Sequence, residues 1–330
     1  MKAIVFDRPG DGSHFHITTV ADPTPAPSEV LVHVAATALN RADLLQREGK
    51  YPVPPGASPL LGLEVAGTVV EVGSETEGFG VGDNVCALVN GGGYAQQIAV
   101  DYRMLLKLPE RLSFTKAAAI PEVFLTAFQA LHWIAKVRAT DTVLIHAGAS
   151  GVGTAAIQLV KLAGALPVVT ASAHKHEQLF DLGAAICIDY HHEDFAERVL
   201  DFTEGMGADI ILDFVGGPYL NKNLECCATD GRIVSLATLG GSRVPDFSMA
   251  PFLRKRIQLT GTTMRSRSNE YRRRLTADFR ENIWPYFADG TLRPVVDTIY
   301  DWEQVDEAHR YMESNANVGK IVMTVGIVDP

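Results

Sequence analysis

A strand, a glycine-rich turn and a helix follow one another in the stretch "TVLIHAGASGVGTAAIQLVKLAG" at residues 142–164. The apolar run before the turn is typical of a buried strand, and apolar residues recur at helical spacing after it. Small residues in the turn let the backbone come close to a ligand. A phosphate fits there, because the N-terminus of the helix presents unpaired N–H groups. The stretch therefore predicts a phosphate-binding loop.

Strands and helices keep alternating after this turn. Apolar runs at 167–172, 185–190, 209–215, 232–238 and 257–263 follow the first strand, and helical patterns lie between the first five strands. Buried parallel strands have continuous apolar runs and need crossover helices. The pattern predicts an α/β fold with a Rossmann-type doubly wound parallel sheet. In that context the loop indicates a dinucleotide site, although its glycines do not form a strict G-x-G-x-x-G.

The rest of the chain has a different pattern. Up to about residue 120, short β-rich runs such as "VLVHVAATAL" alternate with Pro and Gly clusters such as "YPVPPGASP". Strand patterns return in "VVDTIY" and "GKIVMTV", so the C-terminal segment completes an irregular β domain. A chain of 330 residues exceeds one core. We expect one domain of residues 1–121 with 267–330 and one of 122–266, with cofactor and substrate meeting between them.

Composition excludes several classes of protein. Hydrophobic residues at 47% and charged residues at 21% are globular values. A net charge of −10 opposes a broad nucleic-acid surface, so a nucleic-acid partner is not expected. The basic residues between Arg254 and Arg274 are interpreted as a solvated helix face or a cofactor-side loop.

The cysteines and the apolar runs bear on the compartment. Cys86, Cys187, Cys226 and Cys227 form no Cys-x-x-Cys pair, and we expect them to be reduced thiols. The start "MKAIVFDRPG" is typical of a strand and a turn, and no apolar run is expected to reach membrane-spanning length. These features predict a cytoplasmic protein without membrane contact.

The end of the second strand of the sheet decides which dinucleotide is expected. NAD-binding proteins usually place an acidic residue there, whereas NADP needs polar and basic groups. In "VVTASAHKHEQ" no acid precedes Glu177, while Ser172 can donate a hydrogen bond and Lys175 can supply charge. This segment favours NADPH. The competing interpretation is that Lys175 is an ordinary surface lysine.

Several motifs together resemble a known family. "ALNRADLLQREGKYP", "PGASPLLGLEVAGTVVEVG", "AAAIPEVFLTAFQAL" and "HAGASGVGTAAIQLVKLAGA" resemble the zinc-independent, zeta-crystallin-like quinone oxidoreductases of the medium-chain dehydrogenase/reductase superfamily, and the resemblance spans the chain. It implies a GroES-like β domain beside the Rossmann domain. Zinc-dependent alcohol dehydrogenases of this superfamily have zinc ligands where this chain has Asn40 and Leu63, so no metal is expected.

The resemblance also implies a set of cofactor-binding residues. The nicotinamide is expected near the domain junction, the pyrophosphate on the glycine-rich loop, and the adenosine 2′-phosphate at the ends of two neighbouring strands. The nicotinamide residues are Asn40, Thr126, Thr238, Leu239, Thr262, Thr263 and Met264. The pyrophosphate residues are Ala149, Ser150, Gly151 and Val152, and the 2′-phosphate residues are Ser172, Lys175 and Tyr190.

Candidate catalytic residues are Tyr51, Asn40, Asp43 and Ser150. The Tyr51 phenol could stack on a quinone or donate to its carbonyl, and the other three could orient the acceptor or the nicotinamide. Each has a structural alternative: Asn40 and Asp43 as helix caps, Tyr51 as packing, and Ser150 as a residue that shapes the loop.

Four other residues invite a catalytic interpretation that we do not adopt. Tyr94 is expected to face the core and His146 to be a histidine at the end of a strand, and His174 and His176 are expected to face water.

Three functions stay open. The first is NADPH-dependent reduction of small ortho- and para-quinones, which needs no Lewis acid because the cofactor supplies most of the chemistry. The second is reduction of α,β-unsaturated carbonyls, and the third is a crystallin-like protein that binds NADPH or RNA. Self-association is expected by resemblance, as a homodimer or a tetramer, through the open edge of the sixth strand "IQLTGTT".

Overall fold

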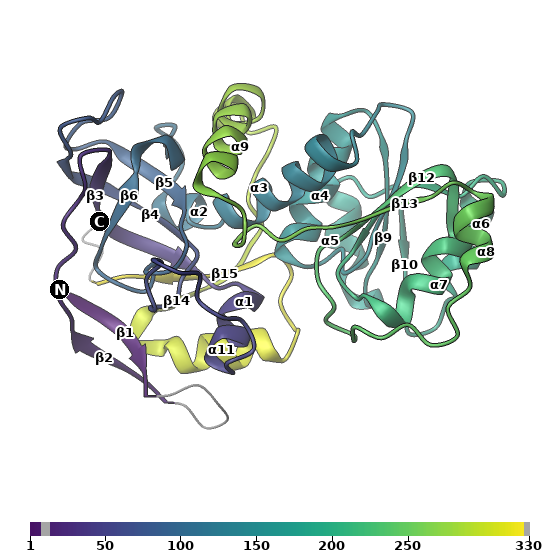
Figure 1. Ribbon diagram of the computed structural model, residues 1–330, viewed down its shortest axis with the longest axis horizontal. Coiled ribbons are helices and arrows are strands. Elements are labelled where there is room, and N and C mark those ends of the chain that lie inside the picture. Colours follow the sequence, from purple (N-terminus) through teal and green to yellow (C-terminus); the bar gives the residue numbers. More distant parts are fainter. Residues whose placement is uncertain (8–13, 327–330) are drawn as a thin grey trace. The chain divides into compact units, whose positions relative to one another are not determined.

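A computed structural model describes residues 1–7 and 14–326. The chain forms two compact units (Figure 1). The first unit contains residues 1–125 and 265–330, and the second contains 126–264. These limits lie close to the predicted ones at 121/122 and 266/267. The turn predicted after the first strand lies largely outside the described residues.

The second unit holds a wholly parallel sheet with the strand order β10-β9-β8-β11-β12-β13. Renumbered along the chain, this is the order 3-2-1-4-5-6 of a doubly wound dinucleotide-binding fold, so the predicted fold class is confirmed. The strands are β8 (Thr142–Ile145), β9 (Leu166–Thr170), β10 (Ile186–Ile188), β11 (Ala208–Asp213), β12 (Cys227–Ser235) and β13 (Gln258–Gly261).

Helices connect these strands and bury their apolar sides against them. Val143, Leu144 and Ile145 of β8 are fully buried at the centre of the sheet, as the continuous apolar run predicts. The helical elements are α4 (Gly151–Leu162), η3 (Ala173–Lys175), α5 (His176–Asp181), α6 (Phe195–Phe202), α7 (Gly217–Cys226) and α8 (Met249–Arg254); α3 (Pro121–Phe128) and a π-helix, η2 (Gln129–Ile134), precede β8.

The first unit is built on a mostly antiparallel sheet with the order β14-β15-β3-β4-β5-β7, and β6 also pairs with β3. The C-terminal strand β15 joins β3, so the chain does return to complete this unit. The strands are β1 (Lys2–Phe6), β2 (Phe15–Thr19), β3 (Glu29–Ala38), β4 (Glu64–Val72), β5 (Asn84–Leu88), β6 (Gln97–Asp101), β7 (Leu105–Lys107), β14 (Val296–Asp301) and β15 (Lys320–Thr324).

The helices of the first unit are short, apart from the arginine-rich α9. They are α1 (Arg41–Arg47), η1 (Tyr102–Met104), α2 (Phe114–Ala117), α9 (Asn269–Asn282), α10 (Pro285–Ala288), η4 (Trp302–Gln304) and α11 (Val305–Glu313).

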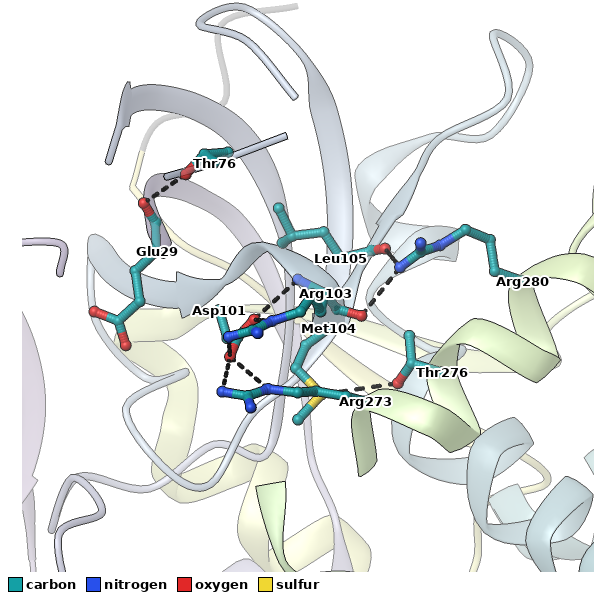
Figure 2. Close-up of polar contacts among 9 residues, drawn as sticks. All are labelled: Glu29, Thr76, Asp101, Arg103, Met104, Leu105, Arg273, Thr276 and Arg280. Carbon is teal, nitrogen blue, oxygen red and sulfur yellow. Dashed lines mark hydrogen bonds and ion pairs between the residues drawn. The ribbon is translucent and has the colours of Figure 1, made fainter. Parts of the chain in front are cut away.

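Polar contacts attach α9 to the segment around η1 (Figure 2). Arg273 Nε donates to Asp101 Oδ2 at 2.8 Å, and Arg280 donates to the carbonyls of Arg103 and Leu105 at 3.0 and 2.8 Å. Asp101 also accepts two hydrogen bonds at 2.8 Å from the Arg103 guanidinium. Arg272 is buried and Arg273 is bound to Asp101, so the interpretation of a solvated face was wrong for these two arginines, whereas Arg274 is exposed, as that interpretation requires.

One helical stretch of the described residues, Phe114–Ile134, is long and apolar enough to cross a membrane by length and composition. The stretch contains Lys116 and Glu122 and is divided between α2, α3 and η2, so it is not an uninterrupted apolar run. Its most apolar window is 72% buried within the protein, as in the core helix of a globular protein.

Candidate functional site

The glycine-rich loop follows β8 at the point where the strand order reverses, between β8 and β11. Ser150 is the N-cap of α4, and its hydroxyl accepts the Gly153 N–H at 3.0 Å. A Cβ on Gly153 would lie 2.5 Å from the carbonyl oxygens of Ala147 and Gly148, so only glycine fits there. The first N–H groups of α4 have no acceptor within the helix and can bind a pyrophosphate. Ser150 thus has the loop-shaping role that was its structural alternative.

Donor groups gather where β9 and its neighbour β10 end. Ser172 Oγ lies 3.4 Å from the Tyr190 hydroxyl and 3.4 Å from His191 Nε2. Lys175 follows Ser172 and is buried, which excludes the interpretation of an ordinary surface lysine. These groups match the needs of a 2′-phosphate. His191 was missed, although it stands next to Tyr190 in the sequence.

The two flanking histidines differ from each other. His174 is exposed, as expected. His176 is only partly exposed and its Nε2 lies 2.9 Å from the Ala171 carbonyl oxygen, so the expectation that it faces water was wrong.

The remaining predicted nicotinamide residues of the second unit lie in separate elements. Thr126 is in α3, Thr238 and Leu239 follow β12, and Thr262 to Met264 follow β13. The Thr262 hydroxyl donates to Gln129 Oε1 at 3.2 Å. The loops after β12 and β13 start at the carboxyl ends of parallel strands, which is the edge where ligands bind in such sheets.

A buried polar network lies in the first unit at the start of α1. Lys320 Nζ is 2.8 Å from Glu64 Oε1 and donates to Asn40 Oδ1 at 2.7 Å. Asn40 Nδ2 donates to the same Glu64 oxygen at 2.9 Å, and the Glu122 N–H donates to Glu64 Oε2 at 2.9 Å. The side chains of Glu64 and Lys320 are 0% and 4% exposed. The Asn40 side chain is thus held by an ion pair.

Asp43 joins this network through the backbone. Its carboxylate accepts the N–H groups of Asn40 at 2.8 Å and Gly62 at 3.0 Å. Burial raises the pKa of Asp43 to about 6, against the effect of these two hydrogen bonds. Asp43 therefore caps α1, which was its structural alternative, and connects α1 to the "GLE" segment.

Zinc does not fit this place. Asn40 and Leu63 stand where zinc ligands were sought, and neither offers a thiolate or an imidazole. The Lys320 ammonium already occupies the oxygens of Asn40 and Glu64. Across residues 1–7 and 14–326, no group of three or more His, Cys, Asp and Glu side chains could hold a metal ion.

Tyr51 is partly buried under a guanidinium. The Arg265 side chain lies over its ring, 5.2 Å from the ring centroid. Burial raises the pKa of the Tyr51 phenol, as does the nearby Glu122 carboxylate, so the phenol stays a hydrogen-bond donor. Its hydroxyl makes no hydrogen bond to the described part of the chain and remains available to a ligand.

Tyr94 faces the core and His146 directly follows β8, as expected for each. His146 is fully buried, with Nε2 2.7 Å from Asn223 Oδ1 and Nδ1 3.1 Å from Thr170 Oγ1. The Tyr94 hydroxyl lies 3.1 Å from Nε2 of the fully buried His309. The four cysteines are free and buried.

His309 predicts a measurable acid sensitivity. Burial lowers its pKa from 6.5 to about 3, so between these values the unfolded chain binds a proton that the folded chain does not. Stability is thus lost as the pH falls through this window. We compare the free energy of unfolding of the protein with that of a His309→Gln variant. The difference between the two should shrink by roughly 1.4 kcal/mol for each unit by which the pH falls within this window. A difference that stays constant with pH in denaturation experiments would contradict this.

Two sequence profiles match the chain. One is described as an alcohol dehydrogenase GroES-like domain and matches residues 26–110, and the other is described as a zinc-binding dehydrogenase and matches residues 182–323. A curated relative is the phenolphthiocerol synthesis polyketide synthase of Mycobacterium marinum, 32% identical over 306 residues. The match covers 91% of this chain, which spans only 14% of the length of that synthase.

Solved structures similar to this one have several described activities. An NAD-dependent alcohol dehydrogenase has a TM-score of 0.87 and 31% identity, and the match covers 99% of this chain and 100% of that one. A quinone oxidoreductase of Pseudomonas syringae and the CurK enoyl reductase each have a TM-score of 0.86 and 28% identity, and each match covers 98% of this chain and 99% of that one.

Proposed function

Because the chain belongs to the medium-chain dehydrogenase/reductase superfamily, whose members are oxidoreductases that bind nicotinamide cofactors, we propose that it reduces small quinones with NADPH and without zinc. Within the superfamily this proposal places it with the zeta-crystallin-like quinone oxidoreductases. NADPH supplies the hydride, and the protein binds and orients the acceptor.

The observation that carries the proposal is the ion-paired network of Asn40, Glu64 and Lys320. The Asn40 amide stands where a zinc-dependent enzyme needs a soft ligand, and the Lys320 ammonium occupies the oxygens of Asn40 and Glu64. Oxidation of an alcohol relies on a Lewis acid to stabilise the alkoxide, whereas an electron-poor quinone accepts a hydride with less help. Tyr51 supports the acceptor side, since its ring can stack on a quinone and its hydroxyl can donate to a quinone carbonyl.

The choice of NADPH rests on Ser172, Lys175, Tyr190 and His191. No carboxylate of the segment "ASAHKH" competes for the ribose, and the two hydroxyls, the lysine and the imidazole can all donate to a phosphate.

Cofactor preference gives a direct test. Lys175→Ala should lower kcat/KM for NADPH by roughly 10- to 100-fold, since a hydrogen bond to a charged group contributes about 1.5–3 kcal/mol. kcat/KM for NADH should change little. Lys161→Ala, an exposed lysine of the same unit, serves as the matched control. An equal loss for both cofactors would contradict the assignment of Lys175 to the 2′-phosphate.

Reduction of α,β-unsaturated carbonyls is the second candidate, favoured by the similarity to the CurK enoyl reductase. Parallel assays of NADPH oxidation with 1,2-naphthoquinone and with an enal separate the two activities. Faster turnover of the enal would replace the first proposal by the second.

We also propose a homodimer formed by pairing of β13 with its copy. β13 is the edge strand of its sheet, all four of its residues are exposed, and Leu259 is 44% exposed. An exposed edge strand presents unpaired backbone N–H and C=O groups, which are a template for pairing with a second chain. Light scattering should give the mass of a dimer or of a tetramer built from dimers, and a monomer would refute the proposal.

A further inference from the structure

Two arginines of the first unit are buried without an ion-pair partner. Arg265 and Arg272 are 7% and 4% exposed, and no carboxylate oxygen of the described residues lies within 4.0 Å of either guanidinium. A buried charge is normally paired, because its desolvation is costly. These two cations therefore require another explanation.

One asparagine holds both of them. Arg265 Nη2 donates to the Asn90 carbonyl oxygen at 3.0 Å, and Arg272 Nη1 donates to the Asn90 side-chain oxygen. Asn90 follows β5, and Arg272 lies in the first turn of α9. The contacts drawn in Figure 2 attach α9 to the first unit, which also contains Asn90. An amide can fix the position of two guanidinium groups, but it does not neutralise their charge.

Several donors of this pair have no acceptor. Arg265 Nε, Arg265 Nη1 and Arg272 Nε are buried and make no hydrogen bond within residues 1–7 and 14–326. An unsatisfied buried donor costs about 1–3 kcal/mol, and each such group calls for an explanation. An anionic oxygen would satisfy these donors and balance their charge.

The nearest acidic side chains do not balance the charge. Glu122 acts on both arginines electrostatically, but burial and the neighbouring Glu64 raise its pKa to about 8. It is therefore largely uncharged near neutral pH. Asp43, which also acts on Arg265, accepts hydrogen bonds from the N–H groups of Asn40 and Gly62. Asp101, which also acts on Arg272, is bound to the guanidinium groups of Arg103 and Arg273.

We propose that Arg265 and Arg272 form an anion-binding subsite beside Tyr51, which selects acceptors that carry an ionised oxygen, such as hydroxyquinones. The guanidinium fork suits a planar oxyanion, and its stacking on Tyr51 places it next to the ring that would contact a quinone. The inference rests on the proposed function and names the class of substrate at that same site.

Two probes of nearly equal shape test it. 2-Hydroxy-1,4-naphthoquinone is ionised near neutral pH and 1,4-naphthoquinone is neutral. Binding is followed by quenching of protein fluorescence, and turnover by NADPH oxidation. The ionised probe should bind at least about tenfold more tightly, which corresponds to about 1.4 kcal/mol. Arg265→Gln should remove this preference.

Arg267→Gln is the matched control. Arg267 lies two residues away and also stands over a tyrosine, 4.5 Å from the ring centroid of Tyr271, and its replacement should keep the preference. Arg265→Lys keeps the charge but loses the planar fork, and should retain only part of the preference. Thermal melting establishes that each variant is folded.

The outcomes separate the subsite from the proposed function. Equal binding of both probes, or a preference that survives in a folded Arg265→Gln variant, overturns the subsite whether or not quinones are reduced. If the preference is present and depends on Arg265 but no quinone is reduced, the subsite stands and the quinone reductase proposal fails.

Discussion

Lys320→Met is expected to lower the free energy of unfolding by about 3–5 kcal/mol, because it leaves the Glu64 carboxylate without a counter-ion in the buried interior. Lys320 also donates to the carbonyl of Leu39 and to the amide oxygen of Asn40, which would both lose a donor. Among the described residues, the Glu64 carboxylate would keep the hydrogen bonds from Asn40 and Glu122 alone. Urea denaturation of both proteins measures the loss.

Two further variants isolate the ion pair as the cause. The double variant Glu64→Gln with Lys320→Met should be more stable than Lys320→Met alone, since it removes the unpaired charge. Arg256→Met breaks an exposed pair with Asp230 and should leave the stability unchanged. A Lys320→Met protein as stable as the starting chain would show that the pair does not organise this network.

Gly153→Ala is expected to weaken NADPH binding at least about tenfold, a cost of about 1.4 kcal/mol. The added Cβ would meet two backbone carbonyl oxygens of the loop at 2.5 Å, so the loop must move away from the conformation that presents its N–H groups. Fluorescence titration with NADPH measures the affinity. Because no acceptor is needed, this result is independent of which substrate the protein reduces.

Gly80→Ala is the control for the same chemical change. Nothing lies within 4 Å of a Cβ at Gly80, so neither stability nor NADPH binding should respond. If Gly153→Ala were folded and bound NADPH as the starting protein does, the loop would not be the pyrophosphate site.

Much of the fold could be predicted because its information is local. The apolar runs at 142–145 and 208–213 are buried parallel strands, and the turn between β8 and α4 needs glycine for contacts that lie within a few residues. The spacing of apolar residues and the residue types typical of turns can be recognised in a single sequence. The return of β15 to β3 could also be predicted, because "GKIVMTV" has the pattern of a strand.

The candidate site was predictable only where its residues share one helix start or lie at the ends of successive parallel strands. Asn40 and Asp43 share one helix start, and Ser172 and Tyr190 end adjacent strands. Lys320 lies 280 positions from Asn40, and nothing in "GKIVMTV" marks its lysine as buried.

The arginine pair shows the same limit more sharply. Arg272 lies in a run of three arginines that is typical of a solvated face, and only the packing of α9 separates the buried one from its neighbours. A signal was nevertheless present. Arg265 directly follows Met264, a predicted nicotinamide residue, and Glu122 lies in the quoted motif "AAAIPEVFLTAFQAL".

The proposal that this protein reduces quinones with NADPH and without zinc is tested by steady-state oxidation of NADPH and NADH with 1,2-naphthoquinone, in the presence and absence of EDTA. The proposal predicts turnover with NADPH, a clear preference for NADPH over NADH, and no effect of the chelator, because Asn40, Glu64 and Lys320 leave no place for zinc. Quinone reduction that EDTA abolishes, or NADPH binding without any quinone reduction, would contradict it.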